Sequence, residues 1–109
     1  MAGRYIKRLK KRLTVRFGQD AAEKLAFTED ISRTGIFIKT PYIIQPGKPI
    51  KVAFDLDQQT VELEGTVVWA KKVPANLIRI AHKCGLGVRI TRFVQGEEAY
   101  LRLFPEGEF

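Results

Sequence analysis

The sequence predicts a small all-β fold, an antiparallel barrel or sandwich, that is followed by one C-terminal helix. The chain has 109 residues, which fits one domain, and 45% of them are hydrophobic, which is enough for a packed core. Apolar and polar residues alternate along several short segments, as they do in strands with one buried face. Turn-forming residues separate these segments at short intervals, which is typical of antiparallel strands.

The first four of about six expected strands follow a basic N-terminus. Residues 13–17 alternate strictly, and Gly18 ends them. Residues 26–32 and 35–39 are two further strands, joined by a two-residue connection. Residues 50–54 alternate again after a stretch rich in proline and glycine.

The longest expected strand spans residues 60–73, after a hairpin connection at 55–59. The positions that the alternation places on one face are Val61, Leu63, Gly65, Val67 and Trp69. Gly65 predicts a bulge, or a bend of the kind that closes a barrel. Residues 84–90 form the last expected strand, after a loop at 74–83.

A C-terminal helix is expected at residues 95–104, where the composition favours helix and Pro105 prevents its continuation. The chain therefore divides into a basic arm at residues 1–12, a barrel with its helix at 13–104 and a tail at 105–109.

The positive charge lies in one segment. The formal net charge is +7, and residues 1–18 hold seven of the nineteen Lys and Arg and none of the twelve Asp and Glu. Residues 19–109 are therefore neutral overall, which excludes a uniformly basic, histone-like protein. Like charges in so short a segment repel each other, so we expect a flexible arm that an anion would order.

The composition argues against several classes of function. Cys84 and His82 are the only cysteine and histidine, so an internal disulfide and a Cys/His zinc cluster are excluded, and Cys84 should be a small buried residue. Glu62 and Glu64 belong on a solvated face, and no phosphate loop or nucleophile elbow is present, so neither catalysis nor a cofactor is expected. No apolar stretch reaches about 20 residues, so we expect a cytoplasmic protein without membrane insertion.

Arginines recur every four residues in the arm, at Arg4, Arg8, Arg12 and Arg16. Arginine presents five donors in one plane, and its charge does not titrate away. It can bind phosphate, reach O6 and N7 of guanine together, or stack on a base. Composition alone equally fits a solvated arm that binds nucleic acid loosely.

A second polar group, Asp30, Ser32 and Gly35, lies at the junction of two expected strands. The carboxylate of Asp30 can accept from N1–H and N2–H of guanine, and the hydroxyl of Ser32 can donate or accept. Gly35 allows a positive φ and a close backbone approach. On its own this segment also fits a tight turn, which favours the same residue types.

Together the two groups resemble the PilZ domain family, whose hallmark is R-x-x-x-R upstream of [D/N]-x-S-x-x-G. The apolar strand after Gly35 and the strands at 65–69 and 85–90 also look like those of the family. The resemblance covers roughly residues 4–104 and implies a six-stranded PilZ-type barrel that binds the bacterial second messenger cyclic di-GMP.

The register of the arginine motif has three solutions. Arg8 with Arg12 directly precedes the first strand, as in compact members, and Arg4 with Arg8 suits members with a longer lead. Arg12 with Arg16 is least favoured, because Arg16 alternates within the strand. Arg8 belongs to the first two registers.

The resemblance implies a role for each motif residue. Arg8 and Arg12 should contact phosphates and guanine edges or faces, with Arg4 as an additional candidate. Asp30 should accept from a guanine Watson–Crick edge and Ser32 should hydrogen-bond close by. The remaining motif residue, Gly35, should keep the turn open.

The expected mechanism is a switch in a stand-alone adaptor. The ligand orders the arm, and the reordered surface meets an unidentified protein effector. One alternative is a barrel that binds nucleic acid with Tyr5 and Phe17 as stacking residues, which is less favoured because most aromatic residues fall in apolar strand patterns. Another is a protein partner bound without the dinucleotide, through residues 95–104 and the tail. The sequence does not decide in which pathway the protein acts or whether it prefers a mixed cyclic dinucleotide. It also does not decide whether the ligand binds as a monomer or as an intercalated dimer.

Overall fold

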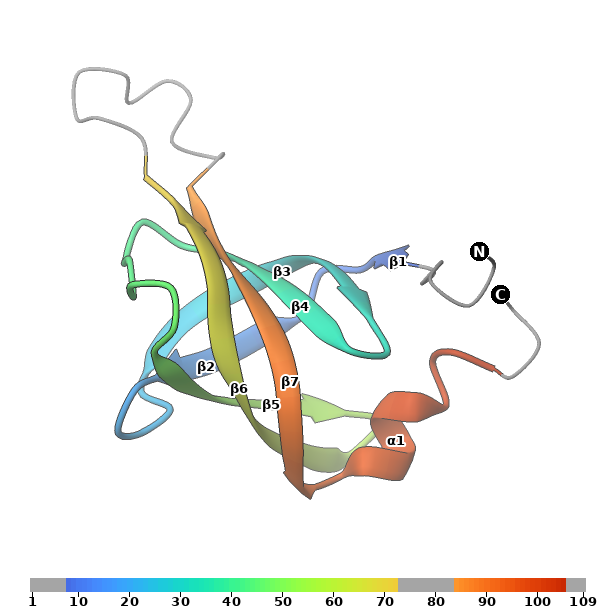
Figure 1. Cartoon of the computed structure of the whole chain (residues 1–109). Helices are drawn as coiled ribbons and strands as arrows, with labels where there is room; N and C mark the ends of the chain where they lie inside the picture. The colour runs from blue at the N-terminus through green and yellow to red at the C-terminus, as the bar shows by residue number, and fades with distance from the viewer. Residues whose placement is uncertain (1–7, 73–83, 106–109) are drawn as a thin grey trace.

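The structure is a computed structural model and describes residues 8–72 and 84–105. Within them, seven strands and one short helix follow each other along the chain (Figure 1). The elements are β1 (Arg8–Lys10), β2 (Thr14–Gly18), β3 (Lys24–Ser32), β4 (Gly35–Lys39), β5 (Pro49–Leu56), β6 (Gln59–Lys71), β7 (Gly85–Gln95) and α1 (Glu97–Leu101). Arg4, the predicted loop at 74–83 and most of the predicted tail lie outside the described residues.

Six of the described strands close into an antiparallel barrel. Pairing runs in the order β3, β2, β5, β6, β7 and β4, and the pairing of β4 with β3 completes the circle. The predicted six-stranded antiparallel barrel with a C-terminal helix is therefore confirmed. β1 is an additional strand, which pairs with the last residues of β3 beyond the stretch that β2 covers.

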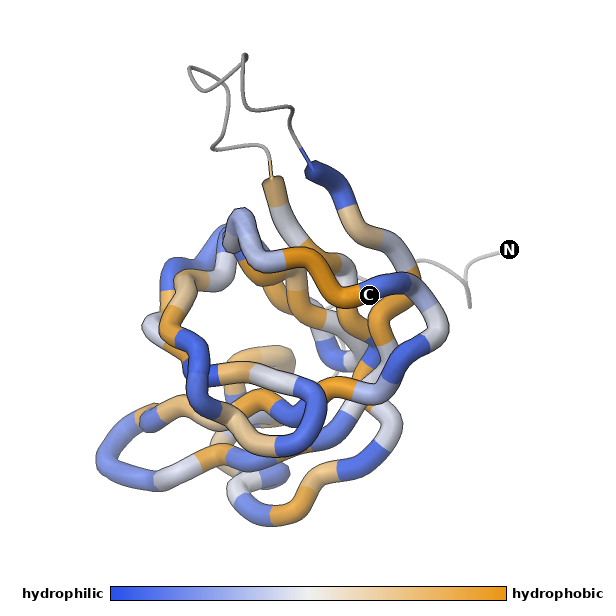
Figure 2. Tube along the Cα trace, turned by 90° about the vertical axis from the view of Figure 1, so that its left-hand side faces the viewer, coloured by the Kyte–Doolittle hydropathy of each residue, from blue (hydrophilic) through white to orange (hydrophobic). Residues whose placement is uncertain are grey.

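The core follows from the alternation in the strands. In β2, Val15 and Phe17 are buried, whereas Thr14 and Arg16, which alternate with them, are exposed. Figure 2 shows the same mixture of apolar and polar positions along the strands that enclose the barrel. Cys84 is buried, as predicted.

α1 is shorter than expected and packs through one aromatic residue. β7 continues to Gln95, and Gly96, with φ of 83°, turns the chain into the helix. Tyr100 is fully buried, and its ring lies 6.1 Å from that of Phe54 and 5.6 Å from that of Phe93. The described part of the chain contains no helix whose length and apolar character would let it cross a membrane.

The long strand β6 changes register along its pairing with β7. The bulge predicted at Gly65 is confirmed by a shift between Glu64 and Gly65, and a Cβ at Gly65 would collide with the carbonyl oxygen of Arg89. A further shift lies between Val67 and Trp69. The prediction that Trp69 shares the face of Val67 is therefore wrong: Val67 is fully buried, and Trp69 is 43% exposed.

Candidate functional site

The turn between β3 and β4 is held by the hydroxyl of Ser32. The hydroxyl oxygen accepts from the backbone N–H of Gly35 at 3.0 Å and from that of Thr34 at 3.3 Å. Because Ser32 is only 1% exposed, its hydroxyl serves this turn in the structure. A contact between Ser32 and a ligand stays a prediction.

Gly35 is needed for a close approach, not for a left-handed backbone. Among the described glycines only Gly47 and Gly96 have a positive φ, so that part of the expectation for Gly35 is wrong. A Cβ at Gly35 would lie 3.0 Å from the carbonyl oxygen of Val88, which is tighter than ordinary contact. The glycine thus lets the turn pack closely against β7.

The C-terminal helix supports the same turn from inside the barrel. The phenol of Tyr100 donates to the carbonyl oxygen of Ser32 at 2.6 Å, and the guanidinium of Arg33 donates to that of Phe104 at 3.0 Å. Burial raises the pKa of Tyr100 far above its usual range, although the charge of Arg8 opposes this, so the phenol remains a neutral donor. The geometry of the turn therefore depends on α1.

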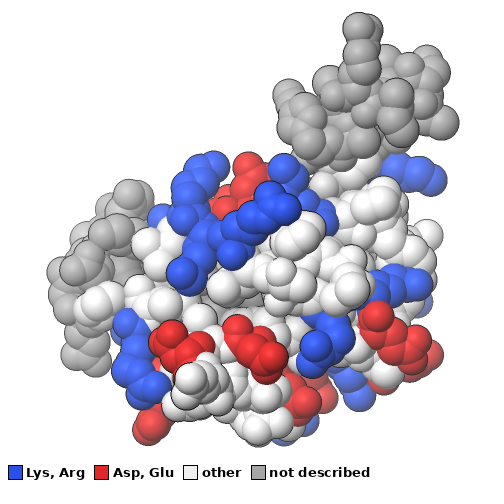
Figure 3. All heavy atoms as spheres, turned by 180° about the vertical axis from the view of Figure 1, so that it is seen from behind, with Lys and Arg blue, Asp and Glu red and all other residues white. Residues whose placement is uncertain are grey.

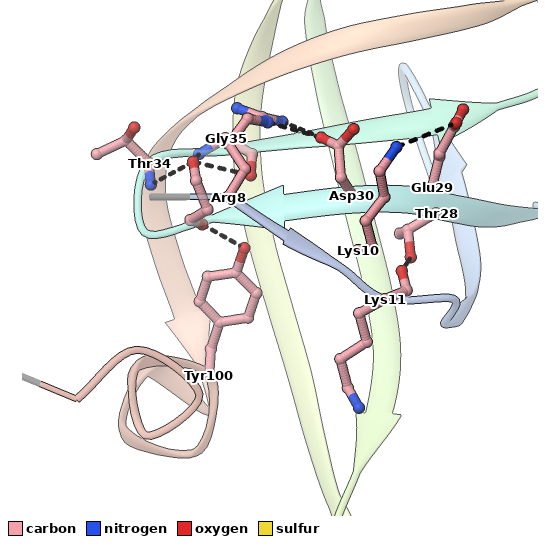
Figure 4. A network of polar contacts seen from close by, with 10 residues as sticks. Arg8, Lys10, Lys11, Thr28, Glu29, Asp30, Thr34, Gly35 and Tyr100 are labelled. Atoms are coloured by element: carbon pink, nitrogen blue, oxygen red, sulfur yellow. Dashed lines mark hydrogen bonds and ion pairs between the residues drawn. The ribbon is translucent and has the colours of Figure 1, made fainter. Parts of the chain in front are cut away.

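Cations of β1 face carboxylates of β3 on the outside of the barrel (Figure 4). Arg8 donates from Nε to Oδ1 of Asp30 at 2.7 Å, and its Nη2 lies 2.5 Å from the same oxygen. Lys10 lies 3.8 Å from Glu29 in a looser pair. Ion pairs this exposed stabilise a fold by about 0–1 kcal/mol, so an anionic ligand can displace them at little cost.

The segment between β1 and β2 is held by the side chain of a buried threonine. The hydroxyl of Thr28 donates to the carbonyl oxygen of Lys11 at 2.6 Å and accepts from the N–H of Leu13 at 2.9 Å. Arg12, between them, places its guanidinium carbon 3.9 Å from the centroid of the Phe27 ring. The two arginines of the favoured motif therefore have different neighbours.

A hollow of about 410 Å³ lies beside the Arg8–Asp30 pair, within the usual range for small-molecule sites. Its lining residues come from five strands and the β3–β4 turn: Arg8, Asp30, Thr34, Gly35, Ile36, Phe37, Val68, Trp69, Gly87, Val88 and Arg89. The structure thus brings three of the predicted residues together in one hollow, namely Arg8, Asp30 and Gly35. Neither Ser32 nor Arg12 lines it.

An aromatic surface forms part of this hollow, and the sequence analysis missed it. The rings of Phe37 and Trp69 have centroids 5.0 Å apart. A Cβ at Gly87 would collide with the indole of Trp69, and one at Gly85 would collide with the ring of Phe37. The paired glycines of β7 were the signal in the sequence, because glycine inside a strand often marks a close approach.

A further cation, Arg89, also lines the hollow, from the β7 position opposite Gly35. Figure 3, which views the molecule from behind, shows Lys and Arg atoms in a band across the upper part, with a small acidic group inside it. Most of the acidic atoms in this view lie in the lower half. The arrangement combines cations, one carboxylate and an aromatic face, a set that suits an anion with planar rings.

The closed six-stranded barrel and the spacing of the two motifs are those expected of a PilZ-type domain, and the comparison with known families agrees. The chain belongs to the PilZ domain family, whose model matches residues 3–104. No match to the sequence was found among curated proteins.

Two solved structures share the fold. The inhibitor of motility MotI/DgrA of Bacillus subtilis has 16% sequence identity and a TM-score of 0.68, and the match covers 91% of this chain and 47% of that one. The PilZ domain of CeSA from a cellulose-synthesizing bacterium has 19% identity and a TM-score of 0.62, with 89% and 93% covered. The chain thus spans about half the length of MotI/DgrA.

Proposed function

We propose that this PilZ domain binds cyclic di-GMP in the hollow beside Arg8 and Asp30 and acts as a receptor for the messenger rather than as an enzyme. One observation carries the proposal: the Arg8–Asp30 pair stands at the same hollow as the exposed ring of Trp69. A phosphate-binding cation, a guanine acceptor and a stacking surface are thus within reach of one ligand.

Binding would exchange the partners of the ion pair. The guanidinium of Arg8 turns to a phosphate or a guanine, and Asp30 then accepts from N1–H and N2–H of a guanine. When Arg8 leaves, the ligand's own donors take its place at Asp30, whose side chain is 20% exposed. Trp69 offers its face to a base, and Arg89 is placed to meet the second phosphate.

The remaining motif residues have supporting roles in this proposal. Ser32 holds the turn that follows Asp30, and Gly35 lets that turn approach β7. Arg12 takes part only if the chain before β2 rearranges, because its guanidinium lies over Phe27. We therefore retain the predicted ordering of the arm around the ligand, followed by binding of an effector protein. In MotI/DgrA the same fold belongs to an inhibitor of motility.

Calorimetric titration with cyclic di-GMP tests the proposal. We expect micromolar or tighter binding, and a loss of tenfold or more in both Arg8→Ala and Asp30→Ala, since a hydrogen bond to a charged group contributes about 1.5–3 kcal/mol. Arg92→Ala and Asp55→Ala are matched controls, because they remove the same side-chain types outside the hollow. Unchanged binding in both site variants would contradict the residue assignment. The absence of binding by the parent chain would contradict the function.

An oligonucleotide titration separates this function from general nucleic-acid binding. A basic arm that binds a polymer loses affinity steeply as salt increases, and it is indifferent to Asp30. We expect only weak oligonucleotide binding, because two of the exposed aromatic rings already have cations over them: Arg12 lies over Phe27, and Lys24 lies 4.0 Å from Tyr42.

A further inference from the structure

A short apolar strip lies on the outer face of β3, beyond the hollow. It consists of Leu25, which is 72% exposed, and Phe27, which is 41% exposed, on either side of the buried Ala26. We call Leu25 and Phe27 the β3 strip. Residues two apart in a strand point to the same face, so these side chains form one surface.

Cations border the β3 strip on both neighbouring strands. Arg16 of β2 lies opposite Leu25, and Lys39 of β4 lies opposite Phe27. Side chains directly opposite each other in antiparallel strands point to the same side of the sheet. The strip is thus apolar along its middle and positive along both edges.

Arg12 covers part of the β3 strip. Its guanidinium lies over the ring of Phe27 at 3.9 Å, the geometry of a cation–π contact. Arg12 also belongs to the arginine motif, although it does not line the hollow. In its position over Phe27 the guanidinium does not line the hollow, so contact with a ligand there requires Arg12 to move.

We propose that Arg12 is a latch: when cyclic di-GMP recruits it, Phe27 is uncovered, and the β3 strip then docks an acidic protein segment that carries apolar side chains. The inference rests on the proposed function and adds to it the surface and the chemistry of the effector. The nucleotide would thereby couple its own binding to that of the effector, and the coupling must be reciprocal.

The charges select this occupant over the alternatives. Arg16 and Lys39 would pair with carboxylates of an incoming segment, whereas a second copy of the chain would bring these cations against each other. Two apolar side chains offer too little area for stable insertion into a bilayer. An extended segment with two apolar residues two positions apart, and acidic residues at the next positions of the same face, would match the spacing of about 7 Å between Leu25 and Phe27.

The latch predicts that removing the Phe27 ring strengthens nucleotide binding. In Phe27→Leu the contact that holds Arg12 is absent, so cyclic di-GMP should bind about two- to fivefold more tightly, the factor that one exposed cation–π contact provides. Val94→Leu is the matched control, because Val94 is an exposed apolar residue on β7. The affinity of this variant for cyclic di-GMP should equal that of the parent chain. Equal or weaker binding in Phe27→Leu would overturn the latch.

A defined probe tests the docking surface. The probe is a fluorescein-labelled peptide of about twelve residues, in which two Val stand two positions apart and Glu occupies the other positions of the same face, and its binding is followed by anisotropy. The parent chain should bind it about two- to fivefold more tightly with cyclic di-GMP than without, whereas Arg12→Gln should bind it equally well with and without the nucleotide. The double variant Leu25→Ser/Phe27→Ser should lose the peptide and keep the nucleotide.

The outcomes separate the two proposals. If the parent chain binds no cyclic di-GMP, the proposed function fails, and peptide binding by Arg12→Gln still decides whether the β3 strip accepts an acidic segment. If the nucleotide binds and leaves peptide affinity unchanged, the latch fails. Equal binding of a peptide with Gln in place of Glu would overturn the charge argument, and binding of phosphatidylglycerol vesicles instead of the peptide would assign the surface to membranes.

Discussion

The two ends of the outer face of β3 carry opposite chemistry, although arginines of one motif contact both. At one end Asp30 pairs with Arg8 beside a hollow, and the turn beyond it is held by Ser32. At the other end Phe27 lies under Arg12. A register shift between Thr28 and Asp30 separates the two ends.

The two arginines of the motif therefore make different kinds of contact, and both contacts are weak. The Arg8 contact is an exposed ion pair, which stabilises by about 0–1 kcal/mol, and the Arg12 contact is an exposed cation–π pair of about 0.5–1 kcal/mol. Both are weak enough for a dinucleotide with two phosphates to replace them. The partners of the two arginines differ, because Arg8 contacts a carboxylate and Arg12 contacts an apolar ring.

The largest loss of stability and of nucleotide affinity should come from a side chain that fills the space between Gly87 and the ring of Trp69. In Gly87→Val the new side chain collides with the indole of Trp69, so we expect the free energy of unfolding to fall by about 1–3 kcal/mol and nucleotide affinity to fall more than tenfold. Chemical denaturation and calorimetry measure the two quantities. Trp69→Ala in the same chain should restore stability without restoring binding. A Gly87→Val chain with parental stability and affinity would contradict this geometry.

Trp69→Ala should weaken cyclic di-GMP binding about five- to hundredfold, because a base stacked on an aromatic ring contributes about 1–3 kcal/mol. The effect on stability should be small, since Trp69 is 43% exposed. Val68→Ala is the control: Val68 lines the same hollow and is 45% exposed, and it has no aromatic face. If the two variants weaken binding equally, Trp69 is not a stacking surface.

A smaller effect is expected from the support behind the turn. Tyr100→Phe leaves the carbonyl oxygen of Ser32 without its donor, which should lower the free energy of unfolding by about 1–2 kcal/mol. The backbone amide signals of Thr34 and Gly35 should shift in nuclear magnetic resonance spectra. Tyr42→Phe, which changes a half-exposed tyrosine, should leave both properties unchanged. Parental amide signals in Tyr100→Phe would show that the turn does not depend on α1.

Much of the barrel could be predicted because burial follows the period of a strand. Val15 and Phe17 alternate with exposed neighbours, and the bulge at Gly65 was visible as a glycine inside a long apolar pattern. β1 could not be predicted in the same way. Its pairing depends on backbone hydrogen bonds and on carboxylates of β3. The strand has a single apolar residue, Leu9, which is too few to show an alternating pattern.

Residues of the site could be predicted only where they belong to a short sequence motif. Asp30 and Gly35 belong to one short motif, and Arg8 belongs to the other. Phe37 and Trp69 meet because both pair with Gly87 in neighbouring strands, a register that no local pattern records. Trp69 was further hidden by the register shift after Val67, which turned it from the expected core face to the outside.

The most direct test of the account follows the two arginines during one titration. In protein labelled with ¹⁵N-arginine, the side-chain Nε–H signals of Arg8 and Arg12, assigned with Arg→Lys variants, are recorded as cyclic di-GMP is added. We expect both signals to move with the same dissociation constant and Arg12 to lose the ring-current shift from Phe27. A signal of Arg8 that moves while that of Arg12 stays would contradict the latch, and two unchanged signals would contradict the nucleotide site itself.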